Sequence, residues 1–94
     1  MELYEIKNGL DKAHLLIDEY RKSAQIDEKL REIEGLSYQT MQDGFWDDPT
    51  KAKKIYDELN DMKKITDEYE NLCQSLNSLD ETYTLVKETD DQEV

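Results

Sequence analysis

The side chains that most often do chemistry in proteins are scarce in this chain. It holds a single histidine, His14, and a single cysteine, Cys73, among 94 residues. A serine nucleophile needs a base and a group that orients the base, so a Ser–His–acid site has little support. One cysteine cannot form an internal disulfide, and the helical spacing around Cys73 favours a small core residue over a reactive thiol. His14 has no Cys or His neighbour at ligand spacing, so we interpret it as an ordinary helix residue and not as a metal ligand.

Carboxylates are abundant, and their abundance argues against treating any one pair as catalytic. The chain holds 24 Asp and Glu residues, so close pairs occur by chance, and nothing predicts the pocket that would separate their pKa values. Asp43, Asp47 and Asp48 superficially resemble a cation-binding loop, yet the Gly and the closing Glu of an EF-hand are missing at the required spacing. Helix capping is the better interpretation. Because no glycine-rich phosphate loop occurs either, we expect no catalytic residue, metal site or cofactor.

Basic residues gather in one part of the chain. They are Lys51, Lys53, Lys54, Lys63 and Lys64. Lysines near a helix start oppose the helix dipole, which would suit a small phosphate or RNA contact made by Lys51, Lys53 and Lys54. Lys53 with Asp57 and Lys54 with Glu58 can instead form surface pairs four residues apart, and we prefer this interpretation. The net charge of −12 makes broad binding to nucleic acid unfavourable.

The stretch that precedes these lysines carries a helix N-terminus signal. The chain's only Pro, Pro49, suits the first position of a helix, where its missing N–H costs nothing. Asp48 is then the natural cap, and Asp47 adds negative charge beside the positive end of the helix dipole. The sequence therefore predicts that a helix begins at Pro49.

The only Phe and the only Trp of the chain, Phe45 and Trp46, stand just before this signal. Hydrophobic side chains in this position commonly fold back on the first turns of the helix that follows, where Ala52, Ile55 and Tyr56 are available. We expect the two aromatics to anchor the turn and to fill the end of a helical bundle. The alternative is an exposed aromatic pair that binds a partner.

Apolar periodicity divides the chain into three helical segments. From Leu3 to Ala24 the apolar residues alternate steps of three and four, which predicts a first helix. The phase then breaks, and Asp27 is predicted to cap a second, shorter helix that extends to about Gln42. Beyond Pro49 the stripe passes through Leu59, Met62 and Ile65, where two successive steps of three shift it sideways, as a stammer does in a coiled coil.

The fold expected from these segments is all-α. It is an antiparallel helical bundle with coiled-coil-like packing, one long third helix and a single domain over residues 1–94. Weak helix formers at 75–80 leave two alternatives, which are three helices or a break near 77–80 that starts a short fourth helix. The acidic end, 'ETDDQEV', lacks a helix terminator, so we expect a chain cut from something longer.

The sequence contains neither a run of about 20 apolar residues nor a signal peptide, so the cytoplasm and no membrane partner are expected. Two functional hypotheses remain, a domain that docks on a larger machine and a self-associating coiled-coil dimer. Strict heptads with complementary flanking charges would favour the dimer, whereas the shifted stripe and three distinct segments favour docking.

The sequence also resembles a known family. 'DEKLREIE', then 'DGFWDDPTKAKKIYDELNDMKKITDEYENL', then 'LVKETDDQEV' together resemble the N-terminal domain of bacterial peptide chain release factor 2. The most specific part is Phe45-Trp46-Asp47-Asp48 with Ala52, which is similar to the family's Pro-Asp-Phe-Trp-Asp-Asp element. The family's Pro before this element is replaced here by 'QDGFW', so Gly44 is expected to provide backbone freedom in the turn.

The resemblance implies a cytoplasmic translation-termination factor that directs peptide release at UAA and UGA codons. The family's Gly-Gly-Gln and Ser-Pro-Phe motifs do not occur in this sequence, so the codon and the peptidyl-tRNA would be contacted only through other domains. The resemblance further implies a non-catalytic domain that packs on the rest of the factor, near the stalk base of the large ribosomal subunit. The alternative is a stand-alone, self-associating helical coiled-coil adaptor; a homodimer could also result from where the chain is cut.

Overall fold

The computed structural model describes residues 1–93, with side chains to residue 91. In this part of the chain three α-helices and one 3-10 turn account for the regular structure, and no strand occurs. The elements are α1 (Leu3–Ser23), α2 (Ile26–Thr40), η1 (Phe45–Asp47) and α3 (Pro49–Glu93). The expected all-α fold with one long third helix is therefore confirmed. Because α3 continues unbroken through 77–80, the alternative with a short fourth helix is wrong for the described residues.

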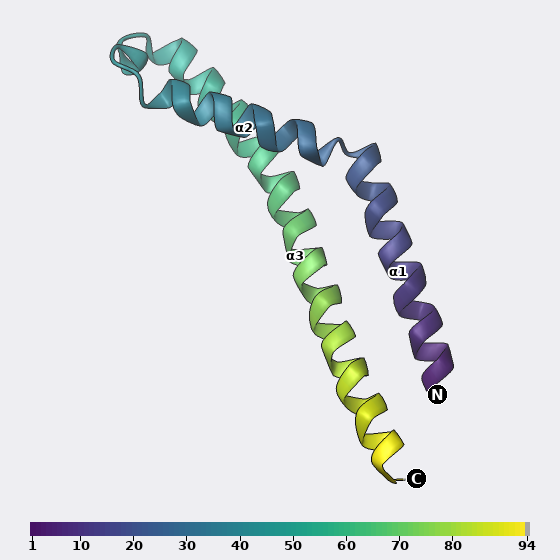
Figure 1. The fold of residues 1–94 in the computed structure, drawn as a ribbon. Coiled ribbons are helices and arrows are strands. Elements are labelled where there is room, and N and C mark those ends of the chain that lie inside the picture. The colour runs from purple at the N-terminus through teal and green to yellow at the C-terminus, as the bar shows by residue number, and fades with distance from the viewer. Residues whose placement is uncertain (94) are drawn as a thin grey trace.

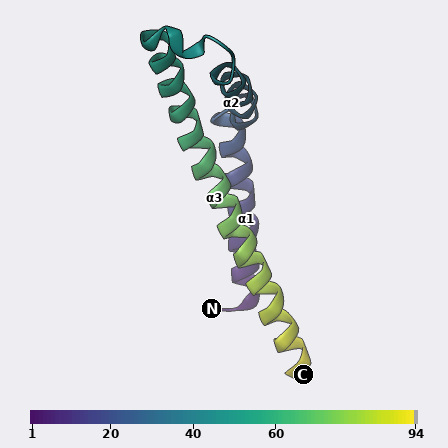
Figure 2. The ribbon, with the colours of Figure 1, turned by 90° about the vertical axis from the view of Figure 1, so that its left-hand side faces the viewer.

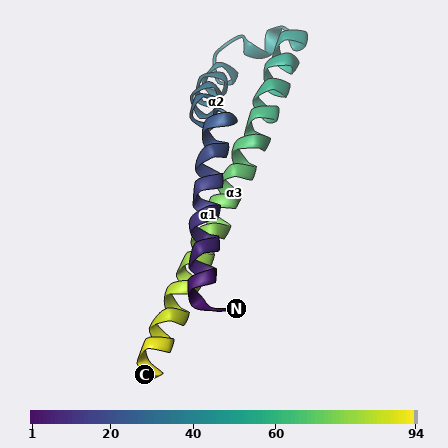
Figure 3. The same ribbon diagram turned by 90° about the vertical axis from the view of Figure 1, so that its right-hand side faces the viewer.

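The three helices form a slender hairpin. In Figure 1, α1 lies beside α3, α2 turns away from α1 and crosses α3 toward the turn, and α3 runs back so that both chain ends lie at the end away from the turn. The molecule measures 69 × 23 × 16 Å. A helix of 45 residues is about 67 Å long at about 1.5 Å per residue, so α3 alone spans the whole length. Figures 2 and 3 show how narrow the molecule is from its two sides.

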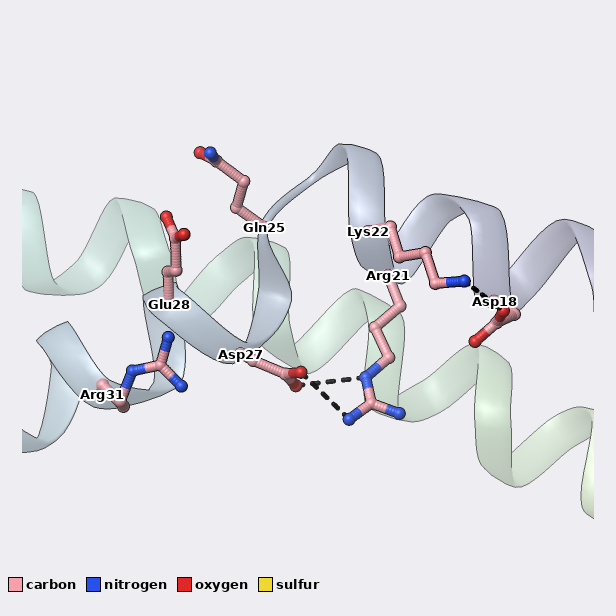
Figure 4. A pocket seen from close by; sticks show the side chains of 7 residues that line it. All are labelled: Asp18, Arg21, Lys22, Gln25, Asp27, Glu28 and Arg31. Carbon is pink, nitrogen blue, oxygen red and sulfur yellow. Dashed lines mark hydrogen bonds and ion pairs between the residues drawn. The ribbon is translucent and has the colours of Figure 1, made fainter.

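The joint between α1 and α2 is a sharp change of direction at one residue. Gln25 adopts a left-handed conformation, with φ 53° and ψ 48°, and the next residue, Ile26, is buried. The prediction that Asp27 caps α2 is wrong, because the helix already begins at Ile26 and Asp27 lies in its first turn. Its carboxylate instead accepts two hydrogen bonds of 3.1 Å from the Arg21 guanidinium across the joint (Figure 4).

The core is a single seam between α3 and the other two helices. Ile65, beside Thr66, is half-buried at the edge of this seam. Along α3 the buried and half-buried residues of the seam itself are Ala52, Ile55, Leu59, Met62, Thr66, Tyr69, Cys73, Leu76, Asp80 and Tyr83. These positions alternate steps of three and four without interruption, as in a coiled coil. The predicted sideways shift of the stripe is therefore wrong for Leu72, Leu79 and Val86, which are exposed, although Ile65 is half-buried as the shifted stripe requires. Because α1 and α2 in turn pack on the same face of α3, that face forms one continuous seam, even though this places the polar residues Thr66 and Asp80 in it.

Thr66 illustrates how a polar residue is accommodated in the seam. It is buried, and its hydroxyl donates a hydrogen bond of 3.2 Å to the carbonyl of Lys63. A buried hydroxyl without a partner would be destabilising, and this bond removes the cost. The unbroken seam leaves Leu72, Leu79 and Val86 outside the core.

The acidic end of α3 is helical to Glu93; Val94, the last residue of the predicted acidic tail, lies outside the described residues. Over the described part of the chain, no helix is both long enough and apolar enough to cross a membrane.

Candidate interaction surface at the hairpin tip

The turn between α2 and α3 brings together most of the residues that the sequence singled out. Gly44 has φ 82°, a left-handed conformation that glycine adopts without strain. The N–H of Phe45 donates to the carbonyl of Gln42 at 3.2 Å, and the N–H of Asp47 donates to the carbonyl of Gly44 at 3.1 Å. The expected backbone freedom of Gly44 is therefore used, and it directs the chain into the 3-10 turn that carries Phe45, Trp46 and Asp47.

The start of α3 is built as the sequence predicts. Asp48 is extended, with φ −111° and ψ 94°, and Pro49 is the first helical residue. The Asp48 carboxylate accepts a hydrogen bond of 3.2 Å from the N–H of Lys51, and its carbonyl accepts one of 2.9 Å from Ala52. The predicted cap is confirmed, and it connects the aromatic turn to the first turn of α3.

The aromatic pair does not fill the end of the bundle. Trp46 is 62% exposed, whereas Phe45 is half-buried. The two rings make an edge-to-face contact with centroids 4.9 Å apart, and Trp46 also lies 5.8 Å from the ring of Tyr56. The expectation that Trp46 fills the end of the bundle is wrong, whereas its contact with Tyr56 agrees with the expected folding back of the aromatic pair on the first turns of α3. The indole is held by two aromatic neighbours with most of its surface free.

Two further apolar side chains are exposed near this end of the hairpin. Tyr38 lies in the last turn of α2, and Met41 directly follows that helix; both are exposed. Neither residue was predicted to form part of a site, because neither fits the apolar stripe of its segment. Their positions outside that stripe are the signal that could have found them. We define the tip surface as Tyr38, Met41, Trp46 and Tyr56.

The lysines at the start of α3 do not form a purely basic patch. Lys53 Nζ lies 2.6 Å from Asp57 Oδ2, and this hydrogen bond and charge raise the pKa of Lys53. Lys53 and Lys54 also share a shallow hollow with acidic residues, among them Glu58 and Asp61. The predicted pair of Lys53 with Asp57 is confirmed. A phosphate contact through Lys51, Lys53 and Lys54 stays a prediction, and the mixed charge around two of them weakens it.

The other candidate residues lie far from the tip, in the half where α1 faces α3. Nε2 of His14 lies 2.6 Å from Oδ2 of Asp80, so this histidine contacts α3 from α1. Cys73 is half-buried in the seam, and its hydrogen bond with Tyr69, together with burial, raises the pKa of the Tyr69 phenol. Among residues 1–93, no group of three His, Cys, Asp or Glu side chains is placed to hold a metal ion.

Comparisons with known proteins identify a family model and several relatives that match this chain. A family model described as the PCRF domain matches residues 7–94. The protein named peptide chain release factor 2 of Exiguobacterium sp. (strain AT1b) is 33% identical over 94 residues, which are 100% of this chain and 26% of that protein. The protein of the same name from Staphylococcus aureus (strain COL) has the same identity and coverage.

That of Staphylococcus saprophyticus is 30% identical over 92 residues, which are 98% of this chain and 25% of that protein. The chain thus spans about a quarter of the length of these curated relatives, at their N-terminal end. No solved structure matches it.

Proposed function

The chain belongs to the PCRF domain family, and on this premise we propose that it is the N-terminal helical domain of a cytoplasmic translation-termination factor of the release factor 2 kind. The observation that carries the proposal is the similarity to proteins of that name along the whole chain. The complete factor would release the finished peptide at UAA and UGA codons. This domain would position the factor on the ribosome and modulate its activity, without contacting the codon or the ester bond.

Within this role, we propose that the domain docks on the ribosome, near the stalk base of the large subunit, through the tip surface. The net charge of −12 repels RNA, so docking must rest on specific contacts and not on general attraction. Trp46 is the tip residue best suited to this, because tryptophan is enriched among the residues that contribute most to binding. Its indole is both exposed and held in place by Phe45 and Tyr56.

Peptide release from ribosomes stalled at UAA, UGA and UAG codons tests the general proposal. The full-length product of the gene is expected to release peptide at UAA and UGA and not at UAG, whereas the 94-residue chain alone is expected to release none. Release by the isolated chain at a rate near that of the full-length product would overturn the assignment of a non-catalytic domain.

A pair of variants in the full-length product tests the tip surface. Trp46→Ala is expected to raise the factor concentration needed for half-maximal release about tenfold, which corresponds to about 1.4 kcal/mol of binding energy. Tyr4→Ala is the matched control, since Tyr4 is an equally exposed aromatic residue near the opposite end of the molecule. Equal effects of the two substitutions would argue against docking through the tip.

A further inference from the structure

An apolar surface that the core does not use runs along one side of α3. Ile65, Leu72, Leu79 and Val86 follow one another at intervals of seven, and each directly precedes a position of the seam or of its continuation. On α1, Leu16 holds the same position relative to Ile17. Because the two helices run in opposite directions, residues that precede equivalent seam positions lie on the same side of the pair. We call these five residues the apolar flank.

The apolar flank is open to solvent. Leu16, Leu72, Leu79 and Val86 are 64%, 50%, 57% and 48% exposed, and Ile65 is half-buried. No other element of residues 1–93 lies along this stretch of α1 and α3 (Figures 1–3). Single exposed apolar residues are common on protein surfaces, whereas several of them along one side of a helix pair suggest an interaction surface.

The opposite side of the same helix pair is polar, which makes the apolar flank a one-sided feature. Residues that directly follow the seam include His14, Glu70 and Asn77, and these three line a hollow between the helices. On this polar side, His14 contacts Asp80 across the two helices. A general excess of apolar residues would have affected both sides, so the contrast points to a partner for one of them.

Charge identifies what kind of partner would fit. Residues 65–93 contain nine acidic residues and one lysine. Glu68 and Glu19 lie three residues beyond Ile65 and Leu16, so they border the apolar flank on its outer edges. A second copy of the chain would bring the same acidic borders and another net charge of −12. A helix with an apolar stripe bordered by Lys and Arg would be complementary to the apolar flank and to the acidic residues that border it.

We propose that the apolar flank is a docking site for an amphipathic helix of another protein, with an apolar stripe edged by basic residues. The distance from Ile65 to Val86 along α3 is about 32 Å at about 1.5 Å per residue, so the partner helix would make about six turns at 3.6 residues per turn. The site is separate from the tip surface and does not rest on the proposed role in termination.

Two synthetic peptides and two double variants test the proposal. Both peptides are helices of 24 residues with leucine at seam spacing; one carries Lys and Arg beside the leucines and the other carries Glu. The flank variant is Leu16→Gln with Leu79→Gln. Its matched control is Leu15→Gln with Leu85→Gln, which changes equally exposed leucines of the same two helices on the faces that point away from the seam.

The basic peptide is expected to bind the chain, as measured by fluorescence anisotropy, and the flank variant to weaken this binding at least tenfold while the control changes it less than twofold. All proteins should keep their helical circular dichroism, because the substituted residues are exposed. The proposal is overturned if the acidic peptide binds equally well, or if both double variants weaken binding equally, since general charge attraction would then suffice.

Two other occupants of the apolar flank would also overturn the proposal. Sedimentation of the chain alone as a dimer that the flank variant converts to a monomer would assign this surface to a second copy. Binding of the basic peptide to the 94-residue chain but not to the full-length product of the gene would mean that a segment of the same protein covers the flank.

Discussion

The unbroken seam on α3 predicts very different effects for two leucines that lie three residues apart. Leu76 is 6% exposed in the seam, whereas Leu79 is more than half exposed on the apolar flank. Leu76→Ala removes a buried side chain and leaves a cavity between α3 and α1, which costs about 2–4 kcal/mol. Leu79→Ala removes a side chain that water already reaches, so we expect a cost below about 1 kcal/mol.

Thermal and urea unfolding of the two variants measures this difference. For a domain of this size, each kcal/mol lowers Tm by roughly 4–8 °C, so Leu76→Ala should unfold at least about 8 °C below the wild type. Domains of this length are stable by about 5–14 kcal/mol in total, so the loss is a large fraction of the stability. The measurements should be made at several protein concentrations, because any self-association through the apolar flank would stabilise the wild type. Equal losses of stability for Leu76→Ala and Leu79→Ala would refute the continuous seam and would favour the shifted stripe predicted from the sequence.

Three further predictions concern the tip and the seam. Trp46→Ala should cost about 1 kcal/mol or less in urea unfolding, as for an exposed residue; a loss of about 3–5 kcal/mol, the range for a buried tryptophan, would contradict the observed exposure. Asp48→Ala should cost about 1 kcal/mol through the lost cap, while Asp48→Asn should retain most of the stability; equal losses would assign the effect to charge. The raised pKa of Tyr69 means that the folded state favours the neutral phenol, so this contribution to stability is complete below the ordinary tyrosine pKa of about 10 and is lost as the pH rises through the folded-state pKa. Absorbance titration at alkaline pH should show one tyrosine that ionises late, and Cys73→Ala, which removes the hydrogen bond, should bring it back toward the others.

Features that depend on neighbouring residues could be predicted from the sequence. The stripe from Leu3 to Ala24 specified the first helix, and Asp48 with Pro49 specified where the third begins, because a helix face and a cap are decided within a few residues. The aromatic turn was found in the same way, since Phe45 and Trp46 directly precede the cap. These local signals were also sufficient to predict an all-α fold with a long third helix.

Features that depend on where another helix lies were decided only by the tertiary structure. Periodicity alone could not show that Thr66 belongs to the core while Leu72 and Leu79 lie outside it, because both sets occur at helical spacing and the partner side selects between them. Trp46 was expected inside because it directly precedes the helix, but its indole is 62% exposed and its ring contacts are only Phe45 and Tyr56. The joint at Gln25 likewise follows from the need to bury Ile26 and to keep α2 along α3. Helices are encoded by local periodicity, whereas the choice of the face that becomes core is made by the helices that pack against it.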